Sequence, residues 1–414
     1  MFKVIDKNFV WNLIGTTINA FNSLFFMIIV TRLIGIEEAG VFTTCFSLAC
    51  LLCIIATYCG RVYHVTDIKN TLNNKEYIIH RIITCILMLI ITGGYMFIKN
   101  YSMYNAIILF LLALYKCLEA FGEIFYGILQ RNDMLYKVGI SLTIKSILSL
   151  IIFTVISILT NNLIYSCITI NIVWILLTII YDIPNSVKLF DLKEKISMKR
   201  IISFFKIAFF TFAFSFLSVY VVNLPKYLLD GRISEEIQAI FGIILMPATI
   251  MILLSQYILS PFVKKMTDAI VIKDKPGFKK IINNLIFAFI GLGIIVIILM
   301  LLCGNRIMSF VYNIDLLKYN LEIILVLIGA LCYGISLIFS AGLTALRYTF
   351  IQFIIYLICS VLGTIFTLVI ISDNIIYPTL SYLFIMILQL VLYMITYIYV
   401  IKKNKNLEVK HERI

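Results

Sequence analysis

Apolar runs of roughly 20 residues recur along the whole chain and constrain its fold more than any other feature. A helix needs about 20 apolar residues to cross about 30 Å of hydrocarbon, because each residue adds about 1.5 Å. Of the 414 residues, 62% are hydrophobic and only 13% are charged. No water-soluble fold can bury so much apolar surface. The sequence therefore predicts an integral membrane protein.

Twelve such runs are present, so the predicted fold class is all-α, a polytopic membrane protein with about 12 transmembrane helices. A weak repeat groups the helices into two six-helix lobes. In each half a helix is followed by a short outer turn and paired acids, Glu37–Glu38 and Glu235–Glu236. Because six crossings return the chain to the side where it started, the two lobes would have the same orientation. The predicted parts are the N-terminal lobe 1–183, the cytoplasmic linker 184–200, the C-terminal lobe 201–401 and the cytoplasmic tail 402–414.

The positions of the basic residues predict the orientation of the chain. The formal net charge is +13, and most of the 34 Lys and Arg residues lie in loops on one side of the predicted helices. The positive-inside rule places that side, with both termini, in the cytoplasm. Basic loops of this kind contact anionic membrane lipids. They do not form a patch on a folded surface, so nucleic acid is not a predicted partner.

Patterns that would mark a metal site or a reaction centre are missing from the sequence. The pair Cys50 and Cys53 has the CxxC spacing of a metal site but no second pair and no nearby histidine. His64 and His80 also lack partners at ligand spacing, and we expect both to be solvated at the membrane interface. No P-loop, HExxH or GxSxG motif occurs. We therefore predict no metal, no cofactor and no enzymatic activity.

Charged side chains inside the fourth predicted helix mark the candidate site. Lys116, Glu119 and Glu123 recur at helical spacing and share one face of an otherwise apolar segment. Ionisable groups in a membrane are costly, and they line a transport path or pair with one another. The first helix has a second polar stripe, which includes Asn12 and Asn19. This stripe would line a hydrated cavity or join helices by hydrogen bonds.

A further intramembrane lysine, Lys145, lies in the fifth predicted helix, about 10 Å from its inner end. Glu123 has a similar depth on the preceding helix, so the two side chains are expected to be able to pair. In that alternative the intramembrane charges neutralise one another and only hold two helices together. Arg61 and Arg81 are assigned to the inner loop between the second and third helices.

Three short segments, in their order along the chain and with this topology, carry a resemblance to a known family: Arg32–Gly35 with Gly40, Tyr126–Arg131, and Asn223–Tyr227. With them the chain resembles a polysaccharide-repeat flippase of the Wzx type. This family belongs to the multidrug/oligosaccharidyl-lipid/polysaccharide (MOP) exporter superfamily, which also contains the multidrug and toxin extruders and the lipid II flippases. The resemblance covers nearly the whole chain. It departs at Ala39, where an aromatic residue usually precedes the glycine.

The resemblance implies that undecaprenyl-pyrophosphate-linked oligosaccharide repeat units are moved across the bacterial cytoplasmic (inner) membrane by alternating access. The product would be O-antigen, capsule or another glycan, and a polysaccharide polymerase is a candidate partner. Pyrophosphate and sugars need a hydrated path with a cation to meet the phosphates, whereas buried carboxyl groups can exchange H+ or bind Na+. The alternative function is an ion-coupled drug or metabolite exporter of the same superfamily. The candidate residues for pyrophosphate or sugar contact are Lys116, Lys145, Arg32, Asn12 and Asn19, and those for ion coupling are Glu119 and Glu123.

Overall fold

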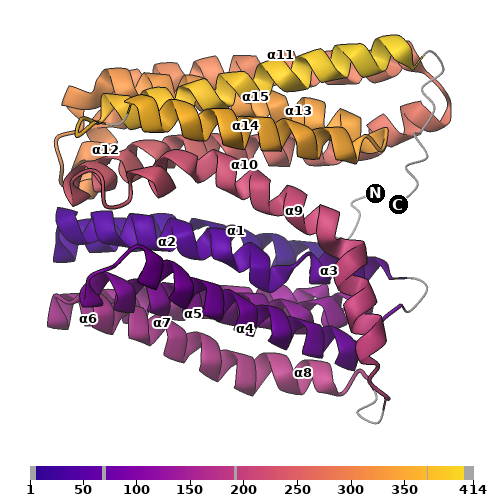
Figure 1. The fold of residues 1–414 in the computed structure, drawn as a ribbon, viewed down its shortest axis with the longest axis horizontal. Coiled ribbons are helices and arrows are strands. Elements are labelled where there is room, and N and C mark those ends of the chain that lie inside the picture. Colours follow the sequence, from indigo (N-terminus) through magenta and orange to yellow (C-terminus); the bar gives the residue numbers. More distant parts are fainter. Residues whose placement is uncertain (1–5, 68–70, 191–193, 371, 405–414) are drawn as a thin grey trace. The chain divides into compact units, whose positions relative to one another are not determined.

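The computed structural model describes residues 6–67, 71–190, 194–370 and 372–404, and over these ranges it is all-α (Figure 1). Eleven helical spans in the described ranges are long and apolar enough to cross a membrane. A twelfth long helix, α5 (Met103–Arg131), carries the three charged residues of the candidate site. The prediction of an all-α polytopic membrane protein is confirmed. Parts of the predicted linker, 191–193, and tail, 405–414, lie outside the described residues.

The helices of the structure match the twelve predicted apolar runs, and several are longer than predicted. Helix α2, for example, begins at Ile36, inside the turn that the sequence placed before it. In chain order the elements are α1 (Lys7–Ile29), η1 (Val30–Ile34), α2 (Ile36–Thr57), α3 (Gly60–Thr66), α4 (Asn74–Ile98), α5 (Met103–Arg131), α6 (Leu135–Thr160), α7 (Leu163–Leu177), η2 (Thr178–Asp182), α8 (Ile183–Val187), α9 (Met198–Leu229), α10 (Glu235–Val271), α11 (Lys275–Leu299), η3 (Met300–Gly304), α12 (Asn305–Tyr312), η4 (Leu317–Tyr319), α13 (Asn320–Ala345), α14 (Thr349–Ile370) and α15 (Ile376–Lys403).

The chain forms two compact units, Met1–Phe216 and Leu217–Ile414. The division falls inside α9, because the first half of this helix packs on the first unit. There Phe204 belongs to a buried cluster with Tyr58 and Tyr77. The predicted linker overlaps α8 and the start of α9. The lobe boundaries taken from the sequence stay a prediction.

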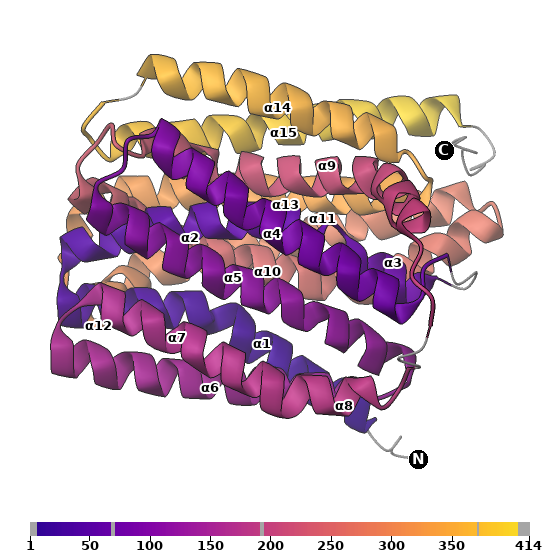
Figure 2. The same ribbon diagram turned by 60° about the horizontal axis from the view of Figure 1, so that its bottom comes forward.

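Helices α1 and α6 of the first unit lie side by side and approach closely (Figure 2). The contact depends on two glycines, Gly15 and Gly139. A Cβ atom on Gly139 would lie 2.0 Å from the carbonyl oxygen of Trp11, and one on Gly15 would lie 2.3 Å from that of Gly139. Small residues permit such close backbone packing in membrane helices. The contact fixes the height of α1 against α6, and both helices contribute polar residues to the candidate site.

Two local departures from regular helical geometry set the positions of residues in the first unit. Helix α2 ends at Thr57, and Tyr58 and Cys59 follow with φ of 38° and 56°, in the left-handed region. The chain then resumes as α3, so carbonyl groups at the end of α2 lack helical partners. The second departure is η2, a π-helical turn that continues α7 through Thr178–Asp182. Such turns occur frequently at functional sites.

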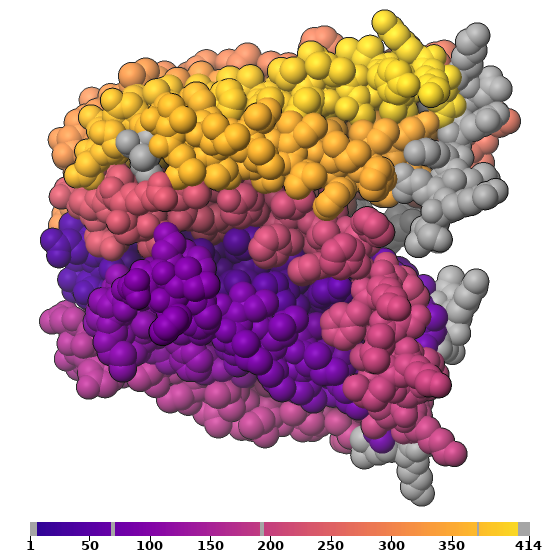
Figure 3. Space-filling view, viewed as in Figure 1, coloured from indigo at the N-terminus to yellow at the C-terminus, as the bar shows by residue number. Residues whose placement is uncertain are grey.

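The second unit has an uncharged polar centre. Gln352 of α14 accepts hydrogen bonds from Ser340 at 2.6 Å and Tyr393 at 3.3 Å, and it donates one to Thr344 at 3.0 Å. Within each unit, side chains fill the spaces between neighbouring helices on the face that Figure 3 presents. The charged intramembrane residues predicted from the sequence all belong to the first unit.

Replacing Gly139 with alanine should destabilise the protein by about 1–3 kcal/mol, because the new methyl group overlaps backbone of α1. The measurement is thermal unfolding of the purified protein in detergent. Gly94→Ala is the matched control, since a Cβ there meets no atom within 4 Å. It should leave stability unchanged or raise it by up to about 1 kcal/mol through helix propensity. Equal melting temperatures for the two variants would contradict the predicted contact.

Candidate functional site

The charged stripe of the first unit lies on α5. Ser102 caps the start of this helix by accepting a hydrogen bond from the Asn105 amide at 3.2 Å. The helix then continues to Arg131 without a break, so Lys116, Glu119 and Glu123 occupy one face over two turns. The sequence prediction of a helical polar stripe in this segment agrees with the structure.

Glu119 is the centre of a contact between three helices. Its Oε2 atom lies 2.6 Å from Lys116 Nζ, and its Oε1 atom accepts a hydrogen bond from Asn19 Nδ2 of α1 at 3.0 Å. Ser146 of α6 donates to Asn19 Oδ1 at 3.2 Å. Both carboxylate oxygens are therefore partnered, and the stripes of the first and fourth predicted helices meet at this point.

A pocket of about 110 Å³ opens beside these residues. Helix α2 contributes two cysteines and a threonine to its wall, and α5 contributes the charged side chains. The exposed fractions of these side chains are 15% for Lys116, 19% for Glu119 and 31% for Glu123, so solvent reaches all three. The lining residues are Cys50, Cys53, Thr57, Lys116, Glu119, Ala120 and Glu123.

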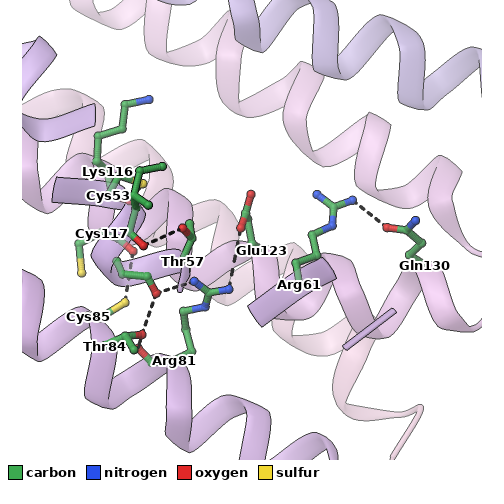
Figure 4. Close-up of polar contacts among 12 residues, drawn as sticks. Cys53, Thr57, Arg61, Arg81, Thr84, Cys85, Lys116, Cys117, Glu123 and Gln130 are labelled. Carbon is green, nitrogen blue, oxygen red and sulfur yellow. Dashed lines mark hydrogen bonds and ion pairs between the residues drawn. The ribbon is translucent and has the colours of Figure 1, made fainter. Parts of the chain in front are cut away.

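Glu123 faces a buried arginine, Arg81, for which the sequence predicts a position in a loop. Arg81 belongs to α4, and its Nη2 atom lies 3.9 Å from Glu123 Oε2 (Figure 4). Its Nη1 atom donates to the carbonyl oxygen of Ala56 at 2.5 Å, and Thr84 Oγ1 donates to the same oxygen at 2.7 Å. The guanidinium group thus satisfies a carbonyl that the break after α2 leaves without a helical partner.

A second arginine, Arg61, lies on the same side of the first unit. It projects from α3 and donates to Gln130 Oε1 at 3.1 Å (Figure 4). Its Cζ atom lies 5.8 Å from the Tyr126 ring centroid. From its sequence position, Arg61 is expected in the inner loop. The sequence signal for this contact is its acceptor, Gln130. It lies two turns beyond Glu123 and continues the polar face of α5.

Lys145 is paired, but its partner differs from the predicted one. Its Nζ atom lies 2.5 Å from Asp182 Oδ2 of η2, and both side chains are 0% exposed. Glu123 instead faces Arg81, so the expected Lys145–Glu123 pair is wrong. Asp182 stands at the end of the sixth predicted helix, and the local pattern gave no sign that it turns into the bundle.

The structure brings some of the predicted site residues together and separates others. Asn19 meets Glu119 at the pocket, whereas Lys145 is enclosed among protein groups. Arg32 lies exposed in the last turn of η1. Asn12 is half-buried beside the close approach of α1 to Gly139. The roles proposed for these residues from the sequence stay predictions.

His64 and His80 are buried, so the expectation that these two side chains are solvated at the membrane interface is wrong. The His64 ring stacks on Tyr77 with centroids 4.3 Å apart, and its Nε2 atom lies 2.7 Å from Asn74 Oδ1. His80 packs against Phe204 and Phe205 of α9. All ten cysteines lie in the described ranges, and none of them forms a disulfide bond there. Among the described residues, no group of three or more His, Cys, Asp or Glu side chains is placed to hold a metal ion.

No family model matches the chain. The capsular polysaccharide biosynthesis protein CapF of Staphylococcus aureus is 24% identical over 328 residues, which cover 78% of this chain and 82% of CapF.

Solved transporter structures share the fold. The inward-facing conformation of a multidrug resistance MATE family transporter of the MOP superfamily gives a TM-score of 0.71 at 11% identity, over 96% of this chain and 98% of that one. The lipid II flippase MurJ in its inward closed conformation gives 0.72 at 18% identity, over 96% and 90%. An outward-facing MATE transporter gives 0.65 at 13% identity, over 97% and 95%. The chain therefore shares its fold with these MATE and MurJ structures.

Thiol labelling checks whether water reaches the pocket. In a protein from which all other cysteines have been removed, Cys53 should react with a charged methanethiosulfonate reagent, because it lines the pocket. Cys167 retained alone should stay unlabelled, because its side chain is fully buried. Labelling is read by mass spectrometry on protein in membrane vesicles. Equal protection of both cysteines would mean that the pocket is dry.

Proposed function

We propose that this protein translocates undecaprenyl-pyrophosphate-linked oligosaccharide repeat units across the bacterial cytoplasmic membrane, by alternating access, for the synthesis of a surface polysaccharide. The MOP-superfamily fold and the similarity to a capsular polysaccharide biosynthesis protein support this proposal. The observation that carries it is the charged pocket on α5, because a lipid-linked sugar pyrophosphate needs polar and cationic groups inside the membrane.

The pocket offers the groups that such a substrate requires. Lys116 in the pocket wall supplies an ammonium for phosphate oxygens, and Asn19, which is not part of the wall, supplies an amide that donates to the Glu119 carboxylate. Glu119 already holds Lys116, so a phosphate would compete with this carboxylate for the ammonium. Binding of H+ or Na+ at Glu119 or Glu123 is therefore linked thermodynamically to binding of the phosphate. This linkage is the basis on which we propose ion coupling at the two glutamates.

The second candidate function is an ion-coupled exporter of drugs or metabolites. The structural likeness to multidrug resistance transporters favours it, since that likeness extends over nearly the whole chain. A drug exporter would need no phosphate contact, so the two functions differ in what loss of the protein does to the cell surface.

Deletion of the gene, with the neighbouring glycan genes intact, should abolish the surface polysaccharide and cause lipid-linked repeat units to accumulate inside the cell. The surface polymer is measured by immunoblotting, and the lipid-linked units by mass spectrometry of extracted lipids. A plasmid copy of the gene should restore both. Normal surface polysaccharide together with increased sensitivity to toxic compounds would instead support the exporter.

Lys116→Ala and Glu123→Gln should each abolish polysaccharide export without lowering the abundance of the protein in the membrane. Solvent reaches Glu119, the group that Lys116→Ala leaves, and Arg81, the group that Glu123→Gln leaves, keeps its hydrogen bond to the Ala56 carbonyl oxygen. Lys99→Ala is the control, because Lys99 is exposed at the end of α4. Export is measured in the deletion strain, and abundance by immunoblotting. Low abundance with normal export per molecule would show that the charges are structural.

A further inference from the structure

The ammonium group of Lys145 is surrounded by oxygen atoms. Its three hydrogens have three acceptors: Asp182 Oδ2 at 2.5 Å, Thr178 Oγ1 at 2.9 Å and the Tyr126 hydroxyl at 3.2 Å. The Trp174 ring centroid lies 4.6 Å from Nζ and covers another side. A lysine ammonium has three donors and no acceptor, so all its hydrogen-bonding capacity is used.

The surrounding groups are themselves ordered by hydrogen bonds. Ser141 donates to Asp182 Oδ1 at 2.6 Å, and its oxygen lies 3.4 Å from the Tyr126 hydroxyl. Because the Ser141 hydrogen is committed to Asp182, Tyr126 is the donor of the longer contact. Lys145, Asp182, Ser141 and Tyr126 thus form a closed ring, which we call the Lys145 ring. Every member is at most 3% exposed.

The local structure places these oxygen atoms around one point, the Lys145 Nζ atom. Ser141 and Lys145 are one turn apart on α6, and Thr178 and Asp182 are one turn apart on η2. Residues four apart lie on the same face of a helical turn. Both η2 side chains can therefore contact the same Nζ atom.

We infer that the oxygen atoms of Asp182, Thr178 and Tyr126 around Lys145 Nζ form a binding site for a monovalent cation, which the chain fills with its own ammonium group. The shell consists of one carboxylate and two hydroxyl oxygens, which are ligands that suit hard cations as well as ammonium. Its Nζ–O distances, 2.5 to 3.2 Å, also suit a potassium ion, which is close to ammonium in size. The ligand class is an alkali cation or a small alkylammonium ion.

Two consequences follow for the first unit. The charge of Lys145 is neutralised inside the ring, so among the lysines proposed for phosphate contact Lys116 is the one that faces the pocket. A free alkali cation has no place beside Lys145 in the native protein, because the ammonium occupies its position. This inference does not depend on the transported substrate.

Removal of the lysine side chain tests the site. Lys145→Ala is purified in detergent, and its thermal unfolding is measured in N-methylglucamine chloride and at equal ionic strength in KCl, NaCl or methylammonium chloride. At 100 mM, one or more of these cations should raise the melting temperature of the variant by about 5 °C more than that of the wild type. The wild type should show no such increment, because its site is filled.

Three further variants separate cation binding from general stability. Lys145→Met fills the space without a charge and should lower the melting temperature without any cation response. Asp182→Asn combined with Lys145→Ala removes the anionic ligand and should abolish the response. Lys145→Ser, which adds a hydroxyl ligand, is measured in the same way should Lys145→Ala be too unstable to purify.

A cation increment in Lys145→Ala or Lys145→Ser that disappears with Asp182→Asn would support the inference. Equal responses of these variants and the wild type would overturn it, and so would failure of both variants to fold in every cation. Because the readout is protein stability, failure of the proposed transport function would leave this result unaffected.

Discussion

The cost of an unpaired charge in a low-dielectric interior governs the arrangement of the first unit. Lys145 on α6 is matched by Asp182 on η2, and the guanidinium of Arg81 on α4 is matched by a carbonyl at the end of α2. Each of these contacts joins elements distant in sequence, so each fixes a helix height as well as a charge. Removing one partner of a buried pair costs about 3–5 kcal/mol, more than most packing changes. The registers of α2, α4, α6 and η2 are thus tied to the positions of a few ionised groups.

The same physical constraint divides the charged residues into two kinds. The Lys145 ring has almost no contact with solvent and its hydrogen bonds are made to other protein groups, so it serves as part of the structural framework of the first unit. The residues on α5 retain 15% to 31% exposure at a pocket, and their internal pairs compete with water. A substrate phosphate or an ion can exchange with the second kind at modest cost, whereas it would have to break a closed ring to reach the first. This difference is why the proposed transport role rests on Lys116, Glu119 and Glu123.

Periodicity and composition were sufficient to predict the twelve helices and the polar face of α5, because both depend on residues near in sequence. They also identified Asn19 and Glu119, which contact each other in the structure. Contacts between distant helices were beyond such reasoning. Similar depth in the membrane suggested Glu123 as the ion-pair partner of Lys145. The partner in the structure is Asp182, and the π-helical turn that contains it has no sequence signature of its own. A charged residue next to an apolar run usually marks the boundary of a helix, and Arg81 was therefore expected in a loop. Helix α4 instead begins seven residues earlier, at Asn74.

Arg81 shows how closely the pocket is connected to the break in α2. One edge of its guanidinium caps the Ala56 carbonyl, and another edge faces Glu123, which is the most exposed of the three pocket charges. Gly60 leaves room for this side chain, since a Cβ there would lie 3.2 Å from Arg81 Nη2. The 3.9 Å separation from Glu123 is longer than a hydrogen bond, so the cap on α2 is the stronger of the two contacts. Loss of the Glu123 charge therefore leaves the guanidinium anchored at the helix end, which separates the electrostatics of the pocket from the stability of the fold.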